Sequence, residues 1–475
     1  MSSEVIGTRA FSTLDQRFFS DLSGDWNPVH VDGEYARRTM FGDVVVHGIH
    51  AVLWALDRYA AVGGEAPATL GAQFVKPIFL HETITLRSID EGGTRMLVLS
   101  SDSVTLATVS LNPQVRASNV AAARATGWPT GPRALGREEL ARSEAELPFD
   151  SDLEALAAAF PSLARLIGSR ACGTIMLLSR LVGMECPGKQ SLFAGLRLSL
   201  ERSERDALTY RVKRSEPAFA PVEMEFSGPD ATGTVAAFFR PAEVAQPTFA
   251  ELRRRVEASE FATTRALVVG GSRGLGEATA KLLAAGGAEV AVTYAVGASD
   301  AERVRREIVE GGGRCQVHQL DVLDPERSLA GICKGFDFDT AYYFATPRIN
   351  GRRKAMFEPE RLRALERYYV DAFADFCRLI GAATGADTVV FYPSTIFIDE
   401  HSRDNIEYAA AKAAGETLGA YLTSSRVVRV ISKRLPRMAT DQTAGIVQVT
   451  VAETVSVLLD AVREVNAAAL ALSAR

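Results

Sequence analysis

The segment from Arg265 to Tyr294 constrains the fold of this chain more than any other. An apolar run at residues 265–269 leads into a glycine turn at 270–276, an alanine-rich helix follows, and a second apolar run ends at Tyr294. Strand, glycine turn, helix and strand in this order form the unit of a doubly wound parallel sheet, in which glycines let the backbone approach a pyrophosphate. The sequence therefore predicts an α/β Rossmann-type domain over residues 262–475.

The first 115 residues follow a different pattern. An apolar helix is expected near residues 47–59. Segments of alternating apolar and polar residues follow it, at residues 72–75, 82–89, 95–100 and 104–111. One long apolar helix before an antiparallel run of strands is what a hot-dog domain needs, because the sheet wraps the helix and buries it. We predict an α+β hot-dog domain over residues 1–115.

Residues 146–245 repeat this pattern, and residues 188–200 parallel residues 68–78. A helical stretch and strand-like segments are expected at residues 161–183, 188–200, 208–212, 221–226 and 233–240. The repeat has no counterpart of the segment from Asp25 to His30, so we interpret residues 1–245 as a double hot-dog with one working and one degenerate half. The alternative is an unrelated small domain at 146–245.

The length of the chain supports several domains. A chain of 475 residues, 47% of them apolar, exceeds the usual size of one core, so two or three domains are expected. The segments between the predicted domains, residues 116–145 and 246–261, are interpreted as linkers. The predicted fold class is thus an α+β double hot-dog followed by an α/β Rossmann-type doubly wound parallel sheet.

Asp25 and His30 form the clearest candidate site. The turn at Asn27-Pro28 holds this carboxyl and imidazole close together. Such a pair can move a proton to or from carbon or oxygen at neutral pH, because an imidazole titrates near pH ~6.5 and a neighbouring carboxylate tunes it. The structural alternative is that Asp25 caps a turn and His30 is a half-buried histidine.

Three of the six histidines, His30, His47 and His50, fall within one short window. Gly48 follows His47 where the apolar helix begins, so its backbone N–H can stabilise an anionic oxygen at the helix N-terminus. An acid/base pair beside such an amide suits chemistry on an activated carbonyl group. His50 is expected to pack or to line a pocket. No His, Cys and carboxylate spacing is typical of a metal site, so none is expected.

The N-terminal part contains the motifs Phe11-Ser-Thr-Leu-Asp, Phe19-Ser-Asp-Leu-Ser-Gly-Asp-Trp-Asn-Pro-Val-His-Val-Asp32, Ala36 and Phe41-Gly-Asp-Val-Val-Val-His-Gly48. Together they resemble the MaoC-like (R)-specific enoyl-thioester hydratases and dehydratases of the hot-dog fold. The resemblance implies that Asp25 and His30 activate a water for addition to a 2-enoyl thioester, or run the reverse elimination. It implies that the Gly48 amide polarises the thioester carbonyl, and that the degenerate half has a structural and thioester-binding role.

The C-terminal part resembles the short-chain dehydrogenases/reductases, and its opening is close to that of the beta-ketoacyl reductases. Gly270, Gly274 and Gly276 match the family's glycine turn, and Tyr408-Ala-Ala-Ala-Lys412 matches its Tyr-x-x-x-Lys pair. The resemblance implies these cofactor-binding residues: Gly270, Ser272, Arg273, Gly274, Leu275, Gly276, Asp321 and Val322 of the adenine pocket, Tyr408 and Lys412.

The spacing of Tyr408 and Lys412 suits reduction of a carbonyl. Residues four apart share a helix face, so Lys412 can lower the pKa of Tyr408 and hold the nicotinamide ribose while Tyr408 passes a proton to the carbonyl. Ser394 or Thr395, at the end of a predicted strand, would hydrogen-bond that carbonyl. Chemistry favours Ser394 and the spacing to Tyr408 favours Thr395, so both are kept. The alternative is that Tyr408 and Lys412 are an exposed helix pair.

Charge near the glycine turn favours NADPH over NADH. NAD enzymes carry an acidic residue after the second strand, where this chain has Tyr294-Ala-Val-Gly, and Arg273 lies where it could meet a 2′-phosphate. The alternative is that Arg273 caps the turn or faces solvent. Departures from the family, at residues 343–347, Val269, Tyr368 and Arg434-Leu-Pro-Arg, leave open a domain that binds nucleotide but reduces poorly.

Composition narrows the class of partner. The formal charge of -5 shows no basic excess, so nucleic acid is not an expected partner. The five cysteines are scattered without CxxC spacing, which indicates reduced thiols in a cytosol. The first residues lack a signal-peptide pattern and no uncharged run has the length of a membrane span, so we expect a cytoplasmic protein with no membrane partner.

The two resemblances together predict a bifunctional NADPH-dependent 3-oxoacyl-thioester ketoreductase and 3-hydroxyacyl-thioester dehydratase, or the reverse enoyl hydratase. The substrate would be an acyl thioester on CoA or an acyl carrier protein, in fatty-acid-like or polyketide-like biosynthesis, and the resemblance implies a homodimer. The alternatives are a hydratase or dehydratase with a catalytically silent reductase-like scaffold, a degradative hydratase and NAD dehydrogenase, and a docking protein with both sites dead.

Overall fold

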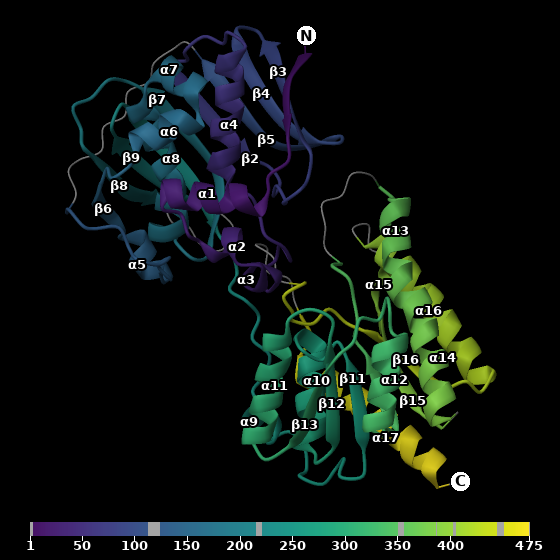
Figure 1. Ribbon diagram of the computed structural model, residues 1–475. Coiled ribbons are helices and arrows are strands. Elements are labelled where there is room, and N and C mark those ends of the chain that lie inside the picture. The colour runs from purple at the N-terminus through teal and green to yellow at the C-terminus, as the bar shows by residue number, and fades with distance from the viewer. Residues whose placement is uncertain are drawn as a thin grey trace. The chain divides into compact units, whose positions relative to one another are not determined.

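The computed structural model describes residues 3–112, 124–214, 221–349, 356–385, 387–401, 405–443 and 451–474. The chain divides into two compact units, with the boundary between Ala242 and Glu243. Each unit is described by itself below, as unit 1 and unit 2 (Figure 1).

Unit 1 is built on one antiparallel sheet whose strand order contains a repeat. The order is β1-β3-β4-β5-β2-β7-β10-β9-β8-β6. The strands are β1 (Ser3–Arg9), β2 (Thr69–Phe74), β3 (Ile84–Glu91), β4 (Thr94–Ser101), β5 (Val104–Asn112), β6 (Glu144–Pro148), β7 (Ser191–Leu200), β8 (Ala207–Arg214), β9 (Val222–Gly228) and β10 (Ala231–Phe239). Counted from either edge, each half of the sheet follows the same order of first, third, fourth, fifth and second strand. The similarity of residues 68–78 and 188–200 is therefore matched in space, because β2 and β7 are the two antiparallel neighbours that join the halves.

One long helix in each half lies against this sheet (Figure 1). Helix α4 (Gly48–Ala61) corresponds to the apolar helix expected at 47–59, and α8 (Ser169–Arg180) is its counterpart in the second half. Both helices contribute to a single hydrophobic core with the inner side chains of the sheet, among them Ile49, Ile175 and Leu196. Shorter helices surround them: α1 (Thr13–Ser23), α2 (Pro28–Val31), α3 (Gly33–Arg37), α5 (Arg137–Ala141), α6 (Leu153–Ala159) and α7 (Pro161–Ile167).

The helix expected at 161–183 is broken into three elements. Helix α7 ends at Gly168, whose φ of 86° favours glycine, and α8 then continues into the π-helical turn η1 (Leu181–Glu185). The predicted linkers were also wrong. The described part of 116–145 contributes α5, the start of β6 and the buried core residues Leu135 and Leu140. Residues 246–261 contain α9 (Phe249–Leu252), which packs in the core of unit 2.

Unit 2 has a six-stranded parallel sheet of order β13-β12-β11-β14-β15-β16. Numbered along the chain this is 3-2-1-4-5-6, the order of a dinucleotide-binding doubly wound sheet. The strands are β11 (Arg265–Val269), β12 (Glu289–Tyr294), β13 (Arg314–Gln319), β14 (Thr340–Tyr343), β15 (Val389–Thr395) and β16 (Arg429–Leu435). The remaining helices are α10 (Gly274–Ala285), α11 (Ala298–Glu310), α12 (Glu326–Gly335), α13 (Pro359–Glu366), α14 (Ala372–Thr384), α15 (Phe397–Glu400), α16 (Ile406–Ser424), α17 (Thr454–Ser473) and the π-helical turn η2 (Arg367–Asp371).

Helices cover both faces of this sheet. Along β11, Ala266 and Val268 pack in a core with α10, α11 and α17, whereas Leu267 and Val269 pack in a second core with α12, α14 and α16. Because successive side chains of a strand point to opposite faces, this alternation explains the continuous apolar run at 265–269.

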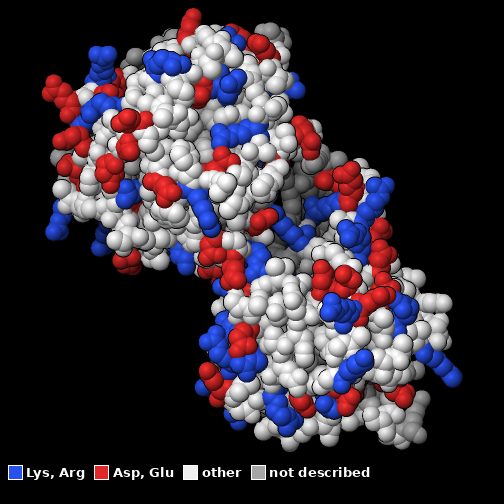
Figure 2. Space-filling model, viewed as in Figure 1, with Lys and Arg blue, Asp and Glu red and all other residues white. Residues whose placement is uncertain are grey.

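The visible surface is mixed in charge. In Figure 2, Lys and Arg side chains are interspersed with Asp and Glu side chains over both units. Within the described residues no single helix is long and apolar enough to cross a membrane. Only together do the two bent helices Pro161–Ile167 and Ser169–Glu185 have the length and the apolar composition of a membrane span.

Candidate active sites

The loop that carries Asp25 and His30 is shaped by the helix ends on either side of it. Gly24, with φ of 73°, ends α1, and the Asn27 side chain accepts a hydrogen bond from the Val29 amide at the start of α2. Pro28 occupies the first position of α2, where its missing N–H costs nothing. Asp25 therefore lies in the short loop between α1 and α2, and His30 lies on α2.

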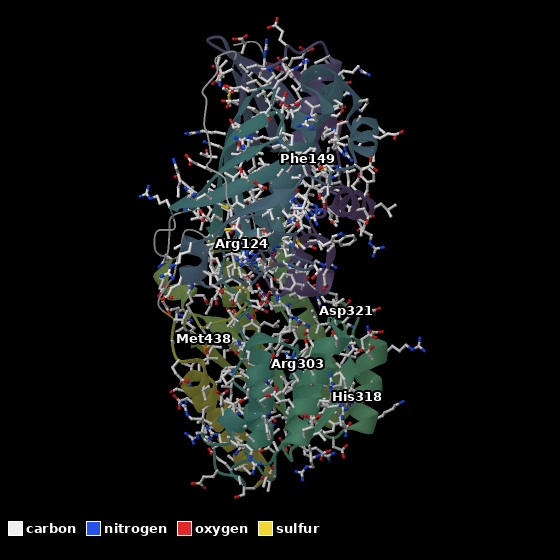
Figure 3. The ribbon with its side chains drawn as sticks, turned by 90° about the vertical axis from the view of Figure 1, so that its left-hand side faces the viewer. Arg124, Phe149, Arg303, His318, Asp321 and Met438 are labelled. Carbon is white, nitrogen blue, oxygen red and sulfur yellow. The ribbon has the colours of Figure 1, made fainter. Side chains whose placement is uncertain are left out.

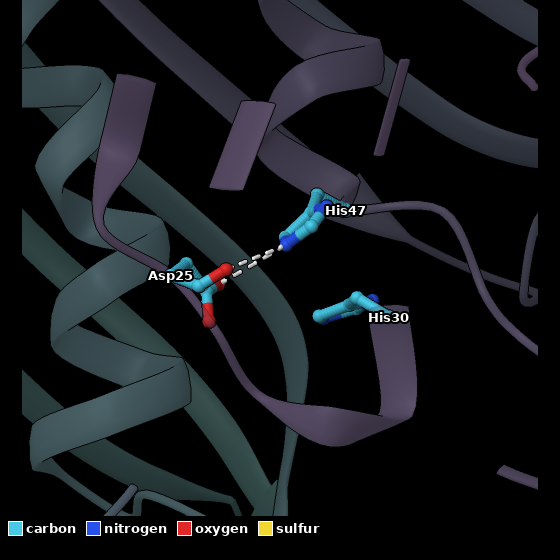
Figure 4. A group of neighbouring side chains, drawn as sticks. All are labelled: Asp25, His30 and His47. Atoms are coloured by element: carbon cyan, nitrogen blue, oxygen red, sulfur yellow. Dashed lines mark hydrogen bonds and ion pairs between the residues drawn. The ribbon is translucent and has the colours of Figure 1, made fainter. Parts of the chain in front are cut away.

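Asp25 is buried and hydrogen-bonded at both carboxylate oxygens. Its Oδ1 accepts from the Asn27 amide at 3.1 Å and its Oδ2 accepts from Ser179 Oγ at 2.7 Å. His47 Nε2 donates to the Asp25 backbone carbonyl at 3.1 Å and lies 3.9 Å from Oδ2 (Figure 4). These contacts fix the direction of the carboxylate.

The imidazole of His30 lies near the Asp25 carboxylate, and its hydrogen bond to the backbone defines its tautomer. Its Nδ1 donates to the Val45 carbonyl at 2.7 Å, so the neutral ring presents the lone pair of Nε2. The ring stacks on His47, with 4.0 Å between the ring centroids. One ligand-type atom from each of Asp25, His30 and His47 falls within 4.8 Å of the others. The predicted pair is therefore brought together, within the reach of one water molecule.

Burial moves the pKa values of the acid and the base toward each other. Burial raises the pKa of Asp25, although the charge of His30 and the hydrogen bond from Ser179 oppose the rise. It lowers the pKa of His30, an effect that the Asp25 charge opposes. It also holds the pKa of His47 well below its ordinary value. His30 and His47 are thus neutral at pH 7, and the imidazole of His30 is available as a base.

Gly48 and His50 lie where the sequence pattern predicts them. Gly48 is the first residue of α4, and a Cβ added there would lie 2.7 Å from the Phe74 ring, so only glycine fits beside this ring. His50 is buried and stacks on Phe19 with 4.7 Å between centroids. Burial lowers its pKa to about 3, so it remains a neutral packing residue.

The cluster of Asp25, His30 and His47 could also be considered as a metal site. The rings of His30 and His47 stack on each other, and His47 Nε2 already donates a hydrogen bond to the Asp25 carbonyl.

The glycine turn of unit 2 has the backbone geometry that a dinucleotide needs. Gly270 and Gly274 have φ of 75° and 56°, and a Cβ added at Gly276 would lie 2.3 Å from the Gly270 carbonyl oxygen. Ser272 is buried in the turn, and Leu275 lies in the first turn of α10, whose N-terminus faces the end of the sheet.

The other predicted cofactor residues lie around this end of the sheet. Arg273 is partly exposed, and its guanidinium lies 3.9 Å from the Asp441 carboxylate, so it forms an ion pair beside the turn. Asp321 and Val322 follow β13, and Figure 3 shows Asp321 beyond the end of the strand that carries His318. Asp321 is exposed and accepts a hydrogen bond from the Leu323 amide, whereas Val322 is buried.

We expect Gly276→Ala to weaken NADPH binding by roughly 5- to 150-fold, because an overpacked contact of this kind typically costs about 1–3 kcal/mol. The added methyl would displace the Gly270 carbonyl and open the turn. Fluorescence titration with NADPH measures the change. Gly331→Ala on α12 is the matched control, since nothing lies within 4 Å of a Cβ added there. Equal affinity in both variants would contradict a nucleotide site at this turn.

Tyr408 and Lys412 share one face of α16, as their spacing predicts. Lys412 is buried, donates to the Pro393 carbonyl at 2.7 Å and lies 3.9 Å from the centre of the Tyr369 ring. Burial lowers its pKa to about 7 and raises the pKa of Tyr408 above the ordinary range. The expectation that Lys412 lowers the pKa of Tyr408 is therefore not met in this structure, because the effect of burial outweighs that of the hydrogen bond with Thr395, and Lys412 Nζ lies 5.9 Å from the centre of the Tyr408 ring.

Adjacent residues of β15 point to opposite sides, which separates Ser394 from Thr395. Thr395 hydrogen-bonds Tyr408 and thereby opposes the rise in the pKa of Tyr408 that burial causes. Ser394 faces Glu416, whose pKa is lowered first by Arg434 and further by Ser394. The structure brings Thr395 to the Tyr408 hydroxyl and turns Ser394 away from it.

One departure from the reductase pattern, in the segment 343–347, lies close to Lys412 through Tyr369. The π-helical turn η2 shifts the register, so Tyr369, and not Tyr368, faces the Tyr408–Lys412 pair. The Tyr369 hydroxyl hydrogen-bonds Thr346 Oγ1 at 2.5 Å, in the segment 343–347 that departs from the family pattern.

Two residues near Asp25 and His30 have no signal in the sequence pattern. Ser179 reaches Asp25 from another part of the chain. Arg240 is fully buried, donates to Tyr35 Oη at 2.8 Å and to the Lys189 carbonyl at 2.7 Å, and adds its charge to the effect of burial in lowering the pKa of His30. A lone arginine at the end of a strand pattern does not indicate such a role.

Comparison with known proteins matches both units. Residues 7–109 match the family described as "MaoC like domain", and residues 264–332 match "short chain dehydrogenase". An Arabidopsis thaliana protein, the mitochondrial 3-hydroxyacyl-[acyl-carrier-protein] dehydratase, is 31% identical over 81 residues, 17% of this chain and 42% of that protein. A 3-oxoacyl-[acyl-carrier-protein] reductase of Synechocystis is 44% identical over 61 residues, 13% of this chain and 25% of that protein.

Other relatives also match only in part. The uncharacterized oxidoreductase YgfF of Escherichia coli is 46% identical over 65 residues, 14% of this chain and 26% of that protein. The chain thus spans less than half the length of each of these relatives. A solved angucycline C-6 ketoreductase, LanV with bound NADP, is 22% identical with a TM-score of 0.39, over 44% of this chain and 92% of that chain. The chain therefore carries a MaoC-like dehydratase domain and a short-chain dehydrogenase/reductase domain.

Proposed function

We propose that this chain is a bifunctional NADPH-dependent 3-oxoacyl-thioester ketoreductase and 3-hydroxyacyl-thioester dehydratase, and that unit 1 is a double hot-dog. The observation that carries the proposal is the convergence of Asp25 and His30 Nε2 beside the N-terminus of α4. The printed names of the acyl-carrier-protein dehydratase and reductase relatives support acyl thioester substrates. CoA and acyl carrier protein are both compatible carriers.

The geometry supports a water held between Asp25 and His30. In hydration, the water would donate one O–H to the Asp25 carboxylate and the other to His30 Nε2, and its oxygen would bond to C3 of a 2-enoyl thioester. One water proton would pass to the Asp25 carboxylate as the oxygen bonds to C3, and the other would stay on that oxygen as the new hydroxyl. The electron pair of the double bond moves toward C2, which takes the proton from Asp25, while the Gly48 amide stabilises the charge on the thioester oxygen. In dehydration Asp25 would take the proton from C2 and give it to the hydroxyl that leaves C3 as water.

Reduction would occur at Tyr408 in unit 2. The glycine cradle fits a dinucleotide, because a Cβ at Gly276 would fill it. NADPH would supply the hydride, held by Gly270, Ser272, Arg273, Gly274, Leu275, Gly276, Asp321, Val322, Tyr408 and Lys412. Thr395 would orient the 3-oxo group and Tyr408 would donate a proton to its oxygen, a role that suits a hydroxyl kept protonated by burial.

One observation favours a second candidate, a dehydratase with a silent reductase-like unit. Lys412 is engaged with the Pro393 carbonyl and with the rings of Tyr369 and Tyr392, so it is turned into the protein interior. If this arrangement persists when a nucleotide is bound, Lys412 cannot hold the ribose.

The two candidates are separated by incubating the whole chain with acetoacetyl-CoA and NADPH. We expect loss of NADPH absorbance followed by appearance of crotonyl-CoA, and we expect crotonyl-CoA alone to be hydrated. Hydration without NADPH consumption would favour the silent reductase-like unit. Absence of both reactions with CoA and with acyl carrier protein substrates would overturn the proposed function.

A further inference from the structure

We propose that Asp441 is a specificity-determining residue for the nucleotide, because its carboxylate competes with the 2′-phosphate of NADPH for Arg273. The inference rests on the proposed NADPH-dependent reductase function. It narrows the cofactor preference expected from Arg273, since a chain whose arginine already has a carboxylate partner discriminates only weakly against NADH.

The pair of Arg273 and Asp441 lies beside the glycine turn. Arg273 directly precedes α10, at the helix N-terminus that would face the pyrophosphate of a dinucleotide. Its Nη1 lies 3.9 Å from Asp441 Oδ2, and the two side chains are 33% and 15% exposed. Thr440 Cγ2 lies 3.8 Å from the position of a Cβ added at Gly274. The loop that carries Asp441, residues 438–443, therefore borders the turn.

Two contacts from another segment hold this loop and its carboxylate in place. The Val244 amide donates to Asp441 Oδ1 at 3.2 Å, so one carboxylate oxygen accepts from the backbone while the other faces Arg273. Gln246 Nε2 donates to the Ala439 carbonyl at 3.2 Å. Both donors lie in the segment that directly follows unit 1. This segment thus directs the carboxylate toward the arginine.

The competition for Arg273 affects only the phosphorylated nucleotide. A phosphate monoester carries roughly two negative charges at neutral pH, and arginine binds it through charge-assisted hydrogen bonds. The 2′-phosphate of NADPH would have to draw Arg273 away from Asp441 or lie near a carboxylate of like charge. NADH has a hydroxyl at this position and meets neither cost. The acidic residue in the first turn of α10, Glu277, is hydrogen-bonded to Lys281 and Arg303.

The test is Asp441→Asn in the whole chain. The asparagine oxygen can still accept a hydrogen bond from Val244, so the loop stays attached while the charge is removed. We expect the Kd for NADPH, measured by fluorescence titration, to fall by roughly 3- to 10-fold, and the Kd for NADH to change by less than about twofold. The gain for NADPH should shrink at high salt, because the pair is partly exposed.

The matched control is Asp337→Asn. Asp337 accepts a hydrogen bond from Arg265 Nη1 at 3.2 Å, so this variant also loses one ion pair between aspartate and arginine. Arg265 begins β11, whereas the glycine turn follows the end of that strand. Asp337→Asn should therefore bind both nucleotides as the wild type does.

The outcomes separate this inference from the proposed function. If the wild-type chain binds NADPH and Asp441→Asn binds it no more tightly, or gains equally for NADPH and NADH, the role of Asp441 is overturned and the nucleotide site stands. A wild-type chain that binds neither nucleotide overturns the proposed reductase function together with the inference. Adenosine 2′,5′-bisphosphate tests the phosphate contact alone. It should bind more tightly to Asp441→Asn than to wild type, whereas AMP should bind equally to both, and an equal response of the two probes overturns the inference.

Discussion

Replacing Asp25 by Asn is expected to reduce hydration of crotonyl-CoA by roughly 10²- to 10⁴-fold, the range that general acid–base groups supply. The amide keeps the size of the carboxylate and can still accept a hydrogen bond from Ser179 or Asn27, but it cannot take a proton from water. The loss should therefore appear in kcat, as measured by the absorbance of the enoyl thioester.

Two controls show whether this loss is chemical. Asp21→Asn changes an exposed aspartate on α1 and should keep full activity. Reduction of acetoacetyl-CoA in unit 2, followed as NADPH consumption, should be unchanged in Asp25→Asn if the chain is bifunctional. A thermal unfolding midpoint near that of wild type excludes collapse of the loop. Hydration at more than half the wild-type rate would contradict the assignment of Asp25.

The repeat in unit 1 could be predicted because strand periodicity is local. Alternation of apolar and polar residues located β3, β4, β5, β8 and β10 to within a few residues. The breaks between consecutive helices were harder to predict. Gly168 ends α7 within one apolar stretch, and apolar periodicity alone cannot distinguish a continuous helix from two packed helices. The predicted linkers were wrong for a different reason, since these alanine- and arginine-rich segments give no periodic signal although they bury Leu135 and Phe249.

A sequence motif identifies only some of the residues in each site. Asp25, His30 and Gly48 lie on one continuous segment, so a single sequence motif contains all three. Ser179 lies near the end of a helix and Arg240 follows a strand, both far along the chain, and only the fold brings them near. In unit 2 the spacing to Tyr408 favoured Thr395 over Ser394. The structure agrees, because strand alternation turns only Thr395 toward Tyr408.

Replacing Tyr408 by Phe is expected to reduce NADPH-dependent reduction of acetoacetyl-CoA by roughly 10²- to 10⁴-fold while hydration of crotonyl-CoA is unchanged. The variant removes one hydroxyl and keeps the ring that packs on Tyr369 and Phe397, so unit 2 should stay folded. Burial raises the pKa of this hydroxyl, which keeps the proton on Tyr408 at neutral pH, the state that a proton donor needs.

The matched control for Tyr408→Phe is Tyr421→Phe, a tyrosine on the same helix that is 64% exposed. NADPH affinity, measured by fluorescence, should be similar in both variants, because the glycine turn carries the pyrophosphate contacts. If Tyr408→Phe reduces acetoacetyl-CoA as fast as Tyr421→Phe, Tyr408 is not the donor. If instead wild type binds NADPH and no variant consumes it, the inward position of Lys412 explains a unit that keeps the nucleotide cradle without the chemistry.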